Sequence, residues 1–543
     1  MPDRSRPLPE RVEIYDTTLR DGSQLEGISL TVDDKLRIAE QLDWLGVDYI
    51  EAGWPGANPK DDEFFRRAPD ELKLERSRLT AFGSTRRPKG KVDSDDTLLR
   101  LLEAGTESVC IVGKCWDYHV TGALGTTLDE AVAMVADSVA FLRGDGRDVL
   151  FDAEHFFDGY RHNAEFSLRV LEAAAEAGVN TLVLCDTNGG SLPGDVEEAV
   201  GAVVDYLDVA VGVHLHDDAG CGVANALAGV RGGATQVQGT INGYGERTGN
   251  CNLTTIIPNL SLKMGVATIP EDRLERLTPV SHHVAELVNI TLNPQAPYVG
   301  ASAFAHKAGL HTSAIAKRPD AYEHVQPDTV GNGTRFVVSE LAGRSTLELK
   351  AQELGLELDG PQLSGVVDKL KELEHEGFHF EAADASLELL LQRATGWEQP
   401  WYRIQSFSVS TDKLPGDDGG AAAGHGNFRT QATIKVAVGD RTVMTAAEGN
   451  GPVNALDGAL RAAIGDDYPA LRNLHLTDYK VRVLDTWKGT GAVTRVLVDT
   501  TDGETTWTTI GVSENIIEAS WQALSDSIVY GLLQAEQRVA HGA

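Results

Sequence analysis

Cysteine is scarce in this chain, with five residues in 543, an odd number with no pair at CxxC spacing. This argues against a disulfide framework and favours a reducing compartment, so we expect a cytoplasmic protein. No uncharged apolar run reaches the roughly 18 residues that a membrane-spanning helix needs. The first residues, MPDRSRPLPERVEIYD, contain no apolar stretch of the kind found in secretory signal peptides. We therefore expect neither a membrane anchor nor a cleaved leader.

Positive charge is also in short supply. Lys and Arg number 48 against 81 Asp and Glu, which gives a formal net charge of −33. Nucleic acid and anionic membranes would repel such a protein, so we expect neither as a partner. Hydrophobic residues make up 42% of the chain, which is ordinary for a folded protein and argues against disorder.

Strand-like and helix-like segments alternate through the first half of the chain. In one helical pattern, Thr31–Leu45, Thr31 is the predicted N-cap, with Asp34 three residues on, and Gly46 is the predicted stop. Eight such units between residues 12 and 270 predict a (β/α)8 TIM barrel. A doubly wound open sheet is the alternative, although it usually has fewer strands. The eight strand-like runs are Val12–Tyr15, Tyr49–Ala52, Leu79–Phe82, Ser108–Val112, Val149–Phe151, Thr181–Leu184, Val209–Val213 and Thr235–Gly239.

The second half of the chain has a different pattern. Residues 271–400 are mostly helical in character, and residues 412–427 are small and polar, which predicts a flexible segment. Two strand-rich blocks, each ended by a helix, predict a duplicated α+β unit. The strand-like runs are Tyr402–Val409, Arg429–Val438, His475–Leu484, Val493–Thr500 and Thr505–Ile510, with helices at Gly451–Ile464 and Ser513–Leu533. We therefore expect a barrel at 1–275, a helical linker subdomain at 276–400 and a separate domain at 401–543.

Polar side chains gather where the predicted barrel strands end. TIM-barrel enzymes carry their catalytic groups at the carboxyl ends of the strands, so this pattern predicts an active site there. The residues are Asp16, Arg20, Asp21, Glu51, Asp152, Glu154, His155, Asp186, Thr187, Asn188, His214, His216, Asp217, Asp218, Asn242, Glu246, Arg247 and Asn250.

His214 and His216 give the sharpest signal among these residues. Residues two apart on a strand point the same way, so both imidazoles face one spot. Two hydrogen-bonded core histidines are the alternative, but Asp21 from the first strand end favours a metal site. A carboxylate and two imidazoles with an amide oxygen suit Mg²⁺ or Mn²⁺, while Zn²⁺ and Fe²⁺ remain chemically possible.

Other features of the sequence give weaker signals. The glycine-rich segment 243–249 is not the GxGxxG fingerprint, so nucleotide binding is not expected there. Cys110 and Cys115 are expected to be buried structural thiols rather than a redox pair.

Several motifs together resemble a known family. TLRDGSQ (18–24), HLHDD (214–218) and GERTGN (245–250) resemble the DRE-TIM metallolyase superfamily, in its Claisen-condensing branch of isopropylmalate, homocitrate and citramalate synthases. The motifs KCWDYHV (114–120), FDAEHFFDGY (151–160), SELAGRS (339–345) and residues 304–332 resemble long-chain (R)-citramalate synthases. GNGPVNALDGAL (449–460) resembles the allosteric dimerisation domain of the isopropylmalate synthase group, so the resemblance spans nearly the whole chain.

The resemblance implies a role for each matching residue. Asp21, His214, His216 and Asn250 match the ligands of the divalent metal. Arg20 matches the arginine that stabilises the enolate or oxyanion, and Glu154 and Thr187 match residues of the substrate site. His306 and Tyr322 match a histidine and a tyrosine implicated in base or hydrolysis steps. Asp217 departs from the family pattern, which often has Asn there, and puts the role of that position in doubt.

The activity implied is condensation of acetyl-CoA with pyruvate to (R)-citramalate and CoA in isoleucine synthesis. A homodimer with isoleucine as feedback inhibitor is implied as well. A 2-isopropylmalate or homocitrate synthase, using a larger 2-oxoacid, is the near alternative. An acyl-CoA lyase fits less well because such lyases commonly stop near the barrel, and the intact metal set argues against an inactive amino-acid-binding regulator. Both substrates are anions, so we expect local cationic groups, namely Arg20, Arg247 and Lys307, to offset the overall charge.

Overall fold

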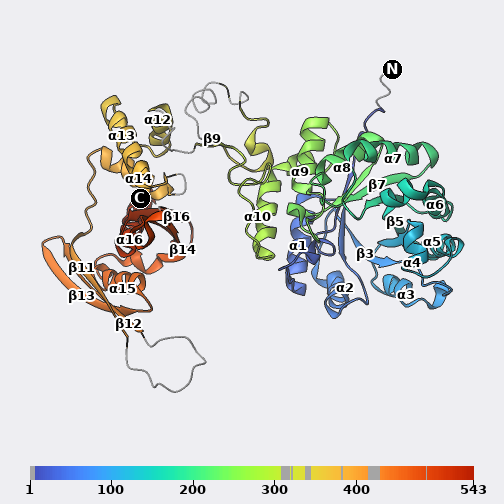
Figure 1. The fold of residues 1–543 in the computed structure, drawn as a ribbon, viewed down its shortest axis with the longest axis horizontal. Helices are drawn as coiled ribbons and strands as arrows, with labels where there is room; N and C mark the ends of the chain where they lie inside the picture. The colour runs from blue at the N-terminus through green and yellow to red at the C-terminus, as the bar shows by residue number, and fades with distance from the viewer. Residues whose placement is uncertain are drawn as a thin grey trace. The chain divides into compact units, whose positions relative to one another are not determined.

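The structure is a computed structural model that describes residues 6–306, 318, 322–336, 344–380, 383–413, 428–484 and 486–542. The chain forms two compact units (Figure 1). The first consists of Met1–Phe304 with Glu323–Thr334, and the second of Ala305–Tyr322 with Arg335–Ala543. The predicted flexible segment 412–427 lies largely outside the described residues, as does Lys307.

The first unit is a closed barrel of eight parallel strands in sequence order. It closes where β1 pairs with β8 in the register Glu13↔Gln236 to Asp16↔Gly239. This confirms the predicted TIM barrel and rules out the open sheet. The strands are β1 (Glu13–Asp16), β2 (Tyr49–Gly53), β3 (Arg78–Ser84), β4 (Ser108–Lys114), β5 (Asp148–Glu154), β6 (Thr181–Asp186), β7 (Ala210–Leu215) and β8 (Gln236–Gly239).

Helices surround this barrel (Figure 1). They are α1 (Val32–Leu45), α2 (Pro59–Glu71), α3 (Asp96–Glu103), α4 (Asp117–Gly122), α5 (Leu128–Gly144), α6 (Phe156–Glu176), α7 (Pro193–Tyr206), α8 (Gly222–Gly232), α9 (Leu253–Pro258) and α10 (Leu277–Leu287). The caps of α1 are those predicted, since Thr31 and Asp34 form a reciprocal capping box and Gly46 ends the helix at φ +97°. Apolar side chains between strands and helices form one continuous core, while Tyr15, Tyr49, Phe82, Cys110 and Leu150 pack inside the barrel.

The second unit contains helices followed by two copies of a strand–strand–strand–helix block. Ahead of the blocks come the strand pair β9 (Ala305–His306) and β10 (Arg335–Phe336), then α12 (Arg344–Glu353), α13 (Gly360–Glu376) and α14 (Asp384–Ala394). The first block has β11 (Arg403–Lys413), β12 (Phe428–Val438), β13 (Arg441–Gly449) and α15 (Pro452–Ile464). The second has β14 (His475–Val483), β15 (Thr494–Thr501), β16 (Thr506–Ser513) and α16 (Ile516–Gly542). Both sheets are antiparallel and run in sequence order, as the predicted duplication requires.

One strand of this unit, β13, was missed by the sequence prediction. Its sequence, RTVMTAAEG, is rich in small residues and largely exposed, so the alternation of apolar and polar residues is weak. The signal that could have revealed it is the two-residue turn Gly439–Asp440, with Gly439 at φ +55°, between paired Val438 and Arg441.

Two further expectations concern cysteines and membranes. All five cysteines are free, and Cys110 and Cys115 are fully buried, as expected for structural thiols. Among the helices that the structure describes, none combines the length and apolar character needed to cross a bilayer.

Candidate active site

A cavity of about 230 Å³ opens at the carboxyl ends of the barrel strands. Half of the polar side chains predicted at the strand ends line it, and they come from elements far apart in the sequence. Because the strands are parallel and close into a ring, their carboxyl ends converge at this one place. The lining residues are Arg20, Asp21, Gln24, Trp54, Phe82, Val112, Asp152, Glu154, Cys185, Thr187, His214, His216, Glu246 and Arg247.

The centre of the cavity is a cluster of one carboxylate and two imidazoles. Asp21 Oδ2 lies 3.1 Å from His214 Nε2 and 3.6 Å from His216 Nε2. All three side chains are buried. Within the described part of the chain, this trio could hold a metal ion, because its ligand atoms all lie within 4.8 Å of one another. His214 lies in β7 and His216 just beyond its end, two residues apart, and both imidazoles face the same spot, as the sequence predicted.

Asn250 completes the cluster and leaves acceptor atoms without partners. Its Nδ2 donates to Asp21 Oδ2 over 2.8 Å and lies 3.3 Å from His214 Nε2. Among the described residues, Asn250 Oδ1 and His216 Nδ1 are buried and have no hydrogen-bond partner. Since Nδ2 faces the cluster and Oδ1 lies against Gly245, the amide would turn over to offer its oxygen, and that oxygen with the carboxylate and two imidazoles fits a divalent cation.

The electrostatics of the cluster keep Asp21 and His216 in ligand form, whereas the pKa of His214 is raised, because the neighbouring Asp21 outweighs the effect of burial. Burial alone would raise the pKa of Asp21, but Arg20 and His214 beside it hold that pKa well below its usual range. Burial and the neighbouring His214 lower the pKa of His216 to about 4, so this imidazole is neutral at neutral pH. An ionised carboxylate and a neutral imidazole are the forms that coordinate metals.

Arg20 lies beside the cluster and is held from three directions. Its Nε donates to Glu51 Oε1 over 2.5 Å, and its Nη1 is 3.5 Å from Asp21 Oδ1. Its guanidinium carbon lies 3.9 Å from the ring centre of Phe82. Glu51, which is fully buried, also accepts a 2.7 Å hydrogen bond from the Tyr15 hydroxyl. These contacts fix a permanent cation at the edge of the cavity.

Glu154 is the last residue of β5, and Thr187 directly follows the neighbouring strand β6. Glu154 forms an ion pair with Lys114 from β4. Thr187 Oγ1 accepts a 2.9 Å hydrogen bond from the backbone N–H of His155, the residue after Glu154. Arg247 donates to the backbone oxygen of Thr187 over 2.8 Å and pairs with Asp218. The predicted substrate residues therefore share one wall of the cavity.

Asp217, the departure from the family pattern, points away from the cluster. Its Oδ1 accepts a 2.6 Å hydrogen bond from the backbone N–H of Gly222, the first residue of α8. A carboxylate is favourable there because helix N-termini carry unpaired N–H groups and a partial positive charge. The extra negative charge thus stabilises the start of α8.

Three other polar residues at strand ends shape loops rather than line the cavity. Asp16 accepts from the backbone N–H and the hydroxyl of Thr18. Asp186 accepts from the Ser191 N–H, and Asn242 binds Ser281 and Tyr244. A polar residue at a strand end can thus either line the cavity or stabilise a loop, and the sequence alone did not distinguish the two.

His306 and Tyr322 belong to the second unit. His306 lies in β9, in register with Phe336 of β10, and Tyr322 is 48% exposed. Their implied roles in base or hydrolysis steps stay predictions.

Five lining residues were absent from the sequence prediction, namely Gln24, Trp54, Phe82, Val112 and Cys185. Phe82 and Val112 lie near the ends of β3 and β4, the two strands for which the search for polar ends found nothing. Their inward-facing position in the strand was the available signal. They supply an apolar part of the cavity wall.

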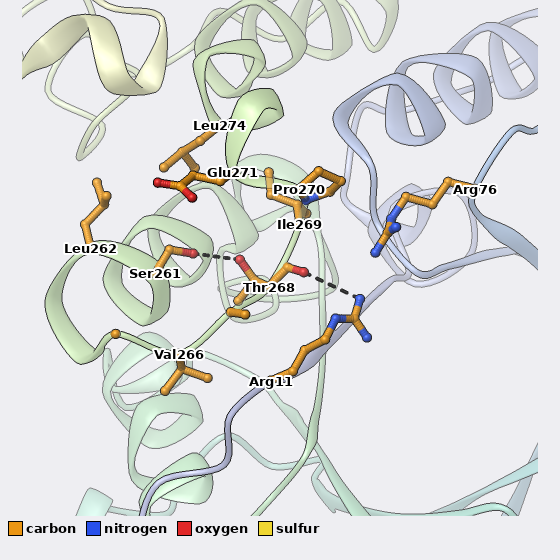
Figure 2. Close-up of a pocket in the computed structure, with 12 residues that line it drawn as sticks. Arg11, Arg76, Ser261, Leu262, Val266, Thr268, Ile269, Pro270, Glu271 and Leu274 are labelled. Atoms are coloured by element: carbon orange, nitrogen blue, oxygen red, sulfur yellow. Dashed lines mark hydrogen bonds between the residues drawn. The ribbon is translucent and has the colours of Figure 1, made fainter.

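A larger hollow, of about 550 Å³, lies at the opposite end of β1 (Figure 2). Arg11, which precedes β1, donates to the backbone oxygen of Thr268 over 3.5 Å. Arg11 and Arg76 both pair with Asp48, at 2.5 and 3.3 Å. These arginines hold the amino-terminal end of the barrel together, where polar residues usually serve stability.

Comparison with known proteins gives matches along nearly the whole chain. Residues 11–284 match the HMGL-like family, 298–377 the homocitrate synthase post-HMGL domain-like family, and 381–532 the LeuA allosteric (dimerisation) domain. The (R)-citramalate synthase of Aquifex aeolicus is 50% identical, with 98% of this chain and 99% of that protein covered. The (R)-citramalate synthase of Streptomyces coelicolor is 51% identical, with 97% and 98% covered. A probable 2-isopropylmalate synthase of Methanopyrus kandleri is 33% identical, with 95% and 97% covered.

Proposed function

Because this chain belongs to the (R)-citramalate synthase family, we propose that it condenses acetyl-CoA with pyruvate and water to give (R)-citramalate and CoA. The enzyme is an acyltransferase in which the acyl group becomes an alkyl group on transfer. The observation that carries the proposal is the cavity itself, where Arg20 lies 3.5 Å from Asp21 of the buried carboxylate–imidazole cluster. That arrangement suits a reaction in which a ketone is polarised while an enolate forms beside it.

The cluster would hold a divalent cation through Asp21, His214, His216 and Asn250. A bound ion would polarise the ketone of an oxoacid and fix its orientation. Oxygen ligands mixed with imidazoles favour Mg²⁺ or Mn²⁺, and Zn²⁺ is the alternative.

Arg20 stabilises the negative charge that develops on the acetyl group when its methyl loses a proton. The methyl of acetyl-CoA is a very weak acid, so removing its proton requires a base and a cation near the thioester oxygen. Arg20 supplies the cation, and Glu51 and Phe82 fix its place before the substrate arrives. Glu154 and Thr187 contact the oxoacid or orient the acyl-CoA. On the cavity wall that these two residues share, Glu154 is the candidate for proton transfer.

The size and lining of the cavity support a small oxoacid. At about 230 Å³ it is smaller than the roughly 300–1,000 Å³ typical of sites that enclose a whole drug-sized ligand. It therefore accommodates the reacting ends of the substrates, while most of the CoA moiety lies outside. Phe82 and Val112 offer an apolar wall to the methyl group of pyruvate. A 2-isopropylmalate or homocitrate synthase, with a larger oxoacid, is the alternative.

The later parts of the chain complete the proposal. His306 and Tyr322 act in the base or hydrolysis steps that release CoA. The LeuA domain match supports binding of an amino-acid effector, which we take to be isoleucine, and formation of a homodimer. The division at 1–275, 276–400 and 401–543 gives the catalytic, linker and regulatory parts. The free cysteines support a cytoplasmic location.

A coupled assay tests the reaction and its substrate. Purified protein with Mg²⁺, acetyl-CoA and one of several 2-oxoacids is followed by titrating released CoA with a thiol reagent. Release that depends on pyruvate supports the proposal. Release only with 2-oxoisovalerate or 2-oxoglutarate would reassign the enzyme to a sister activity, and no release with any oxoacid would refute the synthase class. Adding isoleucine, with valine and leucine as controls, tests the effector, and light scattering after gel filtration tests the dimer.

A further inference from the structure

A buried glutamine, Gln238, forms a hydrogen bond with His214 of the cluster. Gln238, on β8, places Oε1 2.8 Å from His214 Nδ1, and its Nε2 donates to Asp152 Oδ1 over 3.2 Å. Gln238 is fully buried, and Asp152 and His214 are nearly so. These three residues come from β8, β5 and β7, so the chain of hydrogen bonds crosses the inside of the barrel. Gln238 does not line the cavity, so it acts on the site through His214.

The donor and acceptor groups of these residues fix the direction of the hydrogen bonds from His214 to Asp152. A glutamine amide accepts at its oxygen and donates at its nitrogen. Asp152 Oδ1 accepts from the amide nitrogen of Gln238, and the thiol of Cys110 also hydrogen-bonds to Asp152, so the nitrogen side of the Gln238 amide faces Asp152. The amide oxygen then faces His214, and an oxygen can only accept. A neutral His214 imidazole therefore carries its proton on Nδ1, and its Nε2, which lies 3.1 Å from Asp21 Oδ2, is the atom whose lone pair would bind a cation shared with Asp21.

The second histidine of the cluster lacks such support. His216 Nδ1 is buried and has no hydrogen-bond partner among the described residues. The two imidazoles are thus unequal, with one orientation fixed from outside the cluster and the other not. In metal sites the group that accepts from the distal N–H of a histidine fixes its tautomer and raises its basicity.

We propose that Gln238, oriented by Asp152, is a positioning residue that selects the metal-binding tautomer of His214. The inference rests on the proposed metal site and is independent of which oxoacid reacts. Gln238→Leu keeps the approximate size of the side chain but removes the acceptor, so the Nδ1–H of the metal-binding tautomer is left buried without a partner. Gln238→Glu keeps an acceptor facing Nδ1, and because its second oxygen replaces the N–H that Asp152 accepts, the two carboxyl groups must share one proton.

Gln236 provides a matched control on the same strand. It is two residues before Gln238, so it points the same way, and it is equally buried. Its Nε2 donates to Glu13 over 3.2 Å, away from the histidines. Gln236→Leu therefore measures what removing a buried glutamine from β8 does to the fold alone.

Binding of Mn²⁺ to the metal-free protein, followed by electron paramagnetic resonance of the free ion, tests the proposal. We expect Gln238→Leu to weaken Mn²⁺ binding by roughly 10–100-fold, as loss of such a partner does in other metal sites. Gln236→Leu and Gln238→Glu should bind it at least nearly as tightly as the unaltered protein. Equal affinity in Gln238→Leu and the unaltered protein, or equal loss in both leucine variants, would overturn the proposal.

Nuclear magnetic resonance of the His214 Nδ1–H distinguishes a positioning role of Gln238 from general damage to the fold. With ¹⁵N-histidine and diamagnetic Zn²⁺, the Nδ1–H of His214 should give a downfield, hydrogen-bonded cross-peak. That peak should persist in Gln238→Glu and Gln236→Leu and move upfield or vanish in Gln238→Leu. An unchanged peak in Gln238→Leu would overturn the proposal. Absence of metal binding by the unaltered protein would instead refute the metal site on which the inference rests.

Discussion

Replacing Glu51 tests whether the fixed position of Arg20 matters to catalysis. Glu51 accepts from both Arg20 and Tyr15 in a fully buried setting, and burial raises its pKa although Arg20 opposes the rise. Glu51→Ala leaves a buried guanidinium without its closest partner, which costs on the order of 3–5 kcal/mol of folding free energy. Glu51→Gln keeps the shape and a hydrogen-bond acceptor but not the charge, so it should cost about half as much.

The effect on the reaction should exceed the effect on the fold. A guanidinium displaced by about 1 Å loses on the order of 100-fold in rate when it stabilises charge in the transition state. We therefore expect kcat/KM for pyruvate-dependent CoA release to fall about 100-fold in Glu51→Gln. Tyr15→Phe is the control, because it removes one hydrogen bond to Glu51 and should cost only about 1 kcal/mol. Urea unfolding and the thiol assay measure both quantities. Unaltered kcat/KM and stability in Glu51→Gln would refute the reasoning.

Three further predictions follow from the site. Asp217→Asn should change CoA release less than about twofold, because the Oδ1 of Asn can also accept from the Gly222 N–H; loss of metal binding would contradict this role of Asp217. Burial raises the pKa of Asp16 to about 7 from 3.8, so its contribution to stability is present below about pH 4 and is lost as the pH rises through 7. Asp16→Asn should therefore gain about 2 kcal/mol relative to the unaltered protein between pH 5 and pH 7 in urea titrations, whereas a constant difference would contradict the shift. His214→Ala should abolish CoA release and Mn²⁺ binding while circular dichroism stays unchanged; full activity would remove the metal-site argument.

The barrel was predictable because each of its strands carries a local signal. All eight apolar runs overlap the observed strands, and the caps Thr31 and Gly46 mark α1 as expected. Strand β13 escaped because the residues it turns toward the core, such as Val443 and Ala447, are few and small, and because its pairing partner β12 is another segment. A pattern read along one segment cannot reveal a contact supplied by another.

The site was predictable only in part, for a related reason. Residue type and spacing pointed to Asp21, His214 and His216, which the structure brings together. The same reasoning could not tell Asp16, which caps a loop, from residues that face the cavity. It also passed over Phe82, because an apolar residue inside a barrel resembles ordinary packing until the cavity beside it is known.

The two sides of the cavity have different freedom to change during evolution. Charged and metal-ligating groups come from β1, β5 and β7, whereas β3 and β4 contribute Phe82 and Val112. Substitutions at Val112 on β4 can alter the space offered to the oxoacid without breaking the hydrogen bonds among Asp21, His214 and Asn250, whereas Phe82 on β3 also packs against the Arg20 guanidinium. A new substrate preference can therefore begin at Val112, while the charged and metal-ligating groups across the cavity are inherited intact.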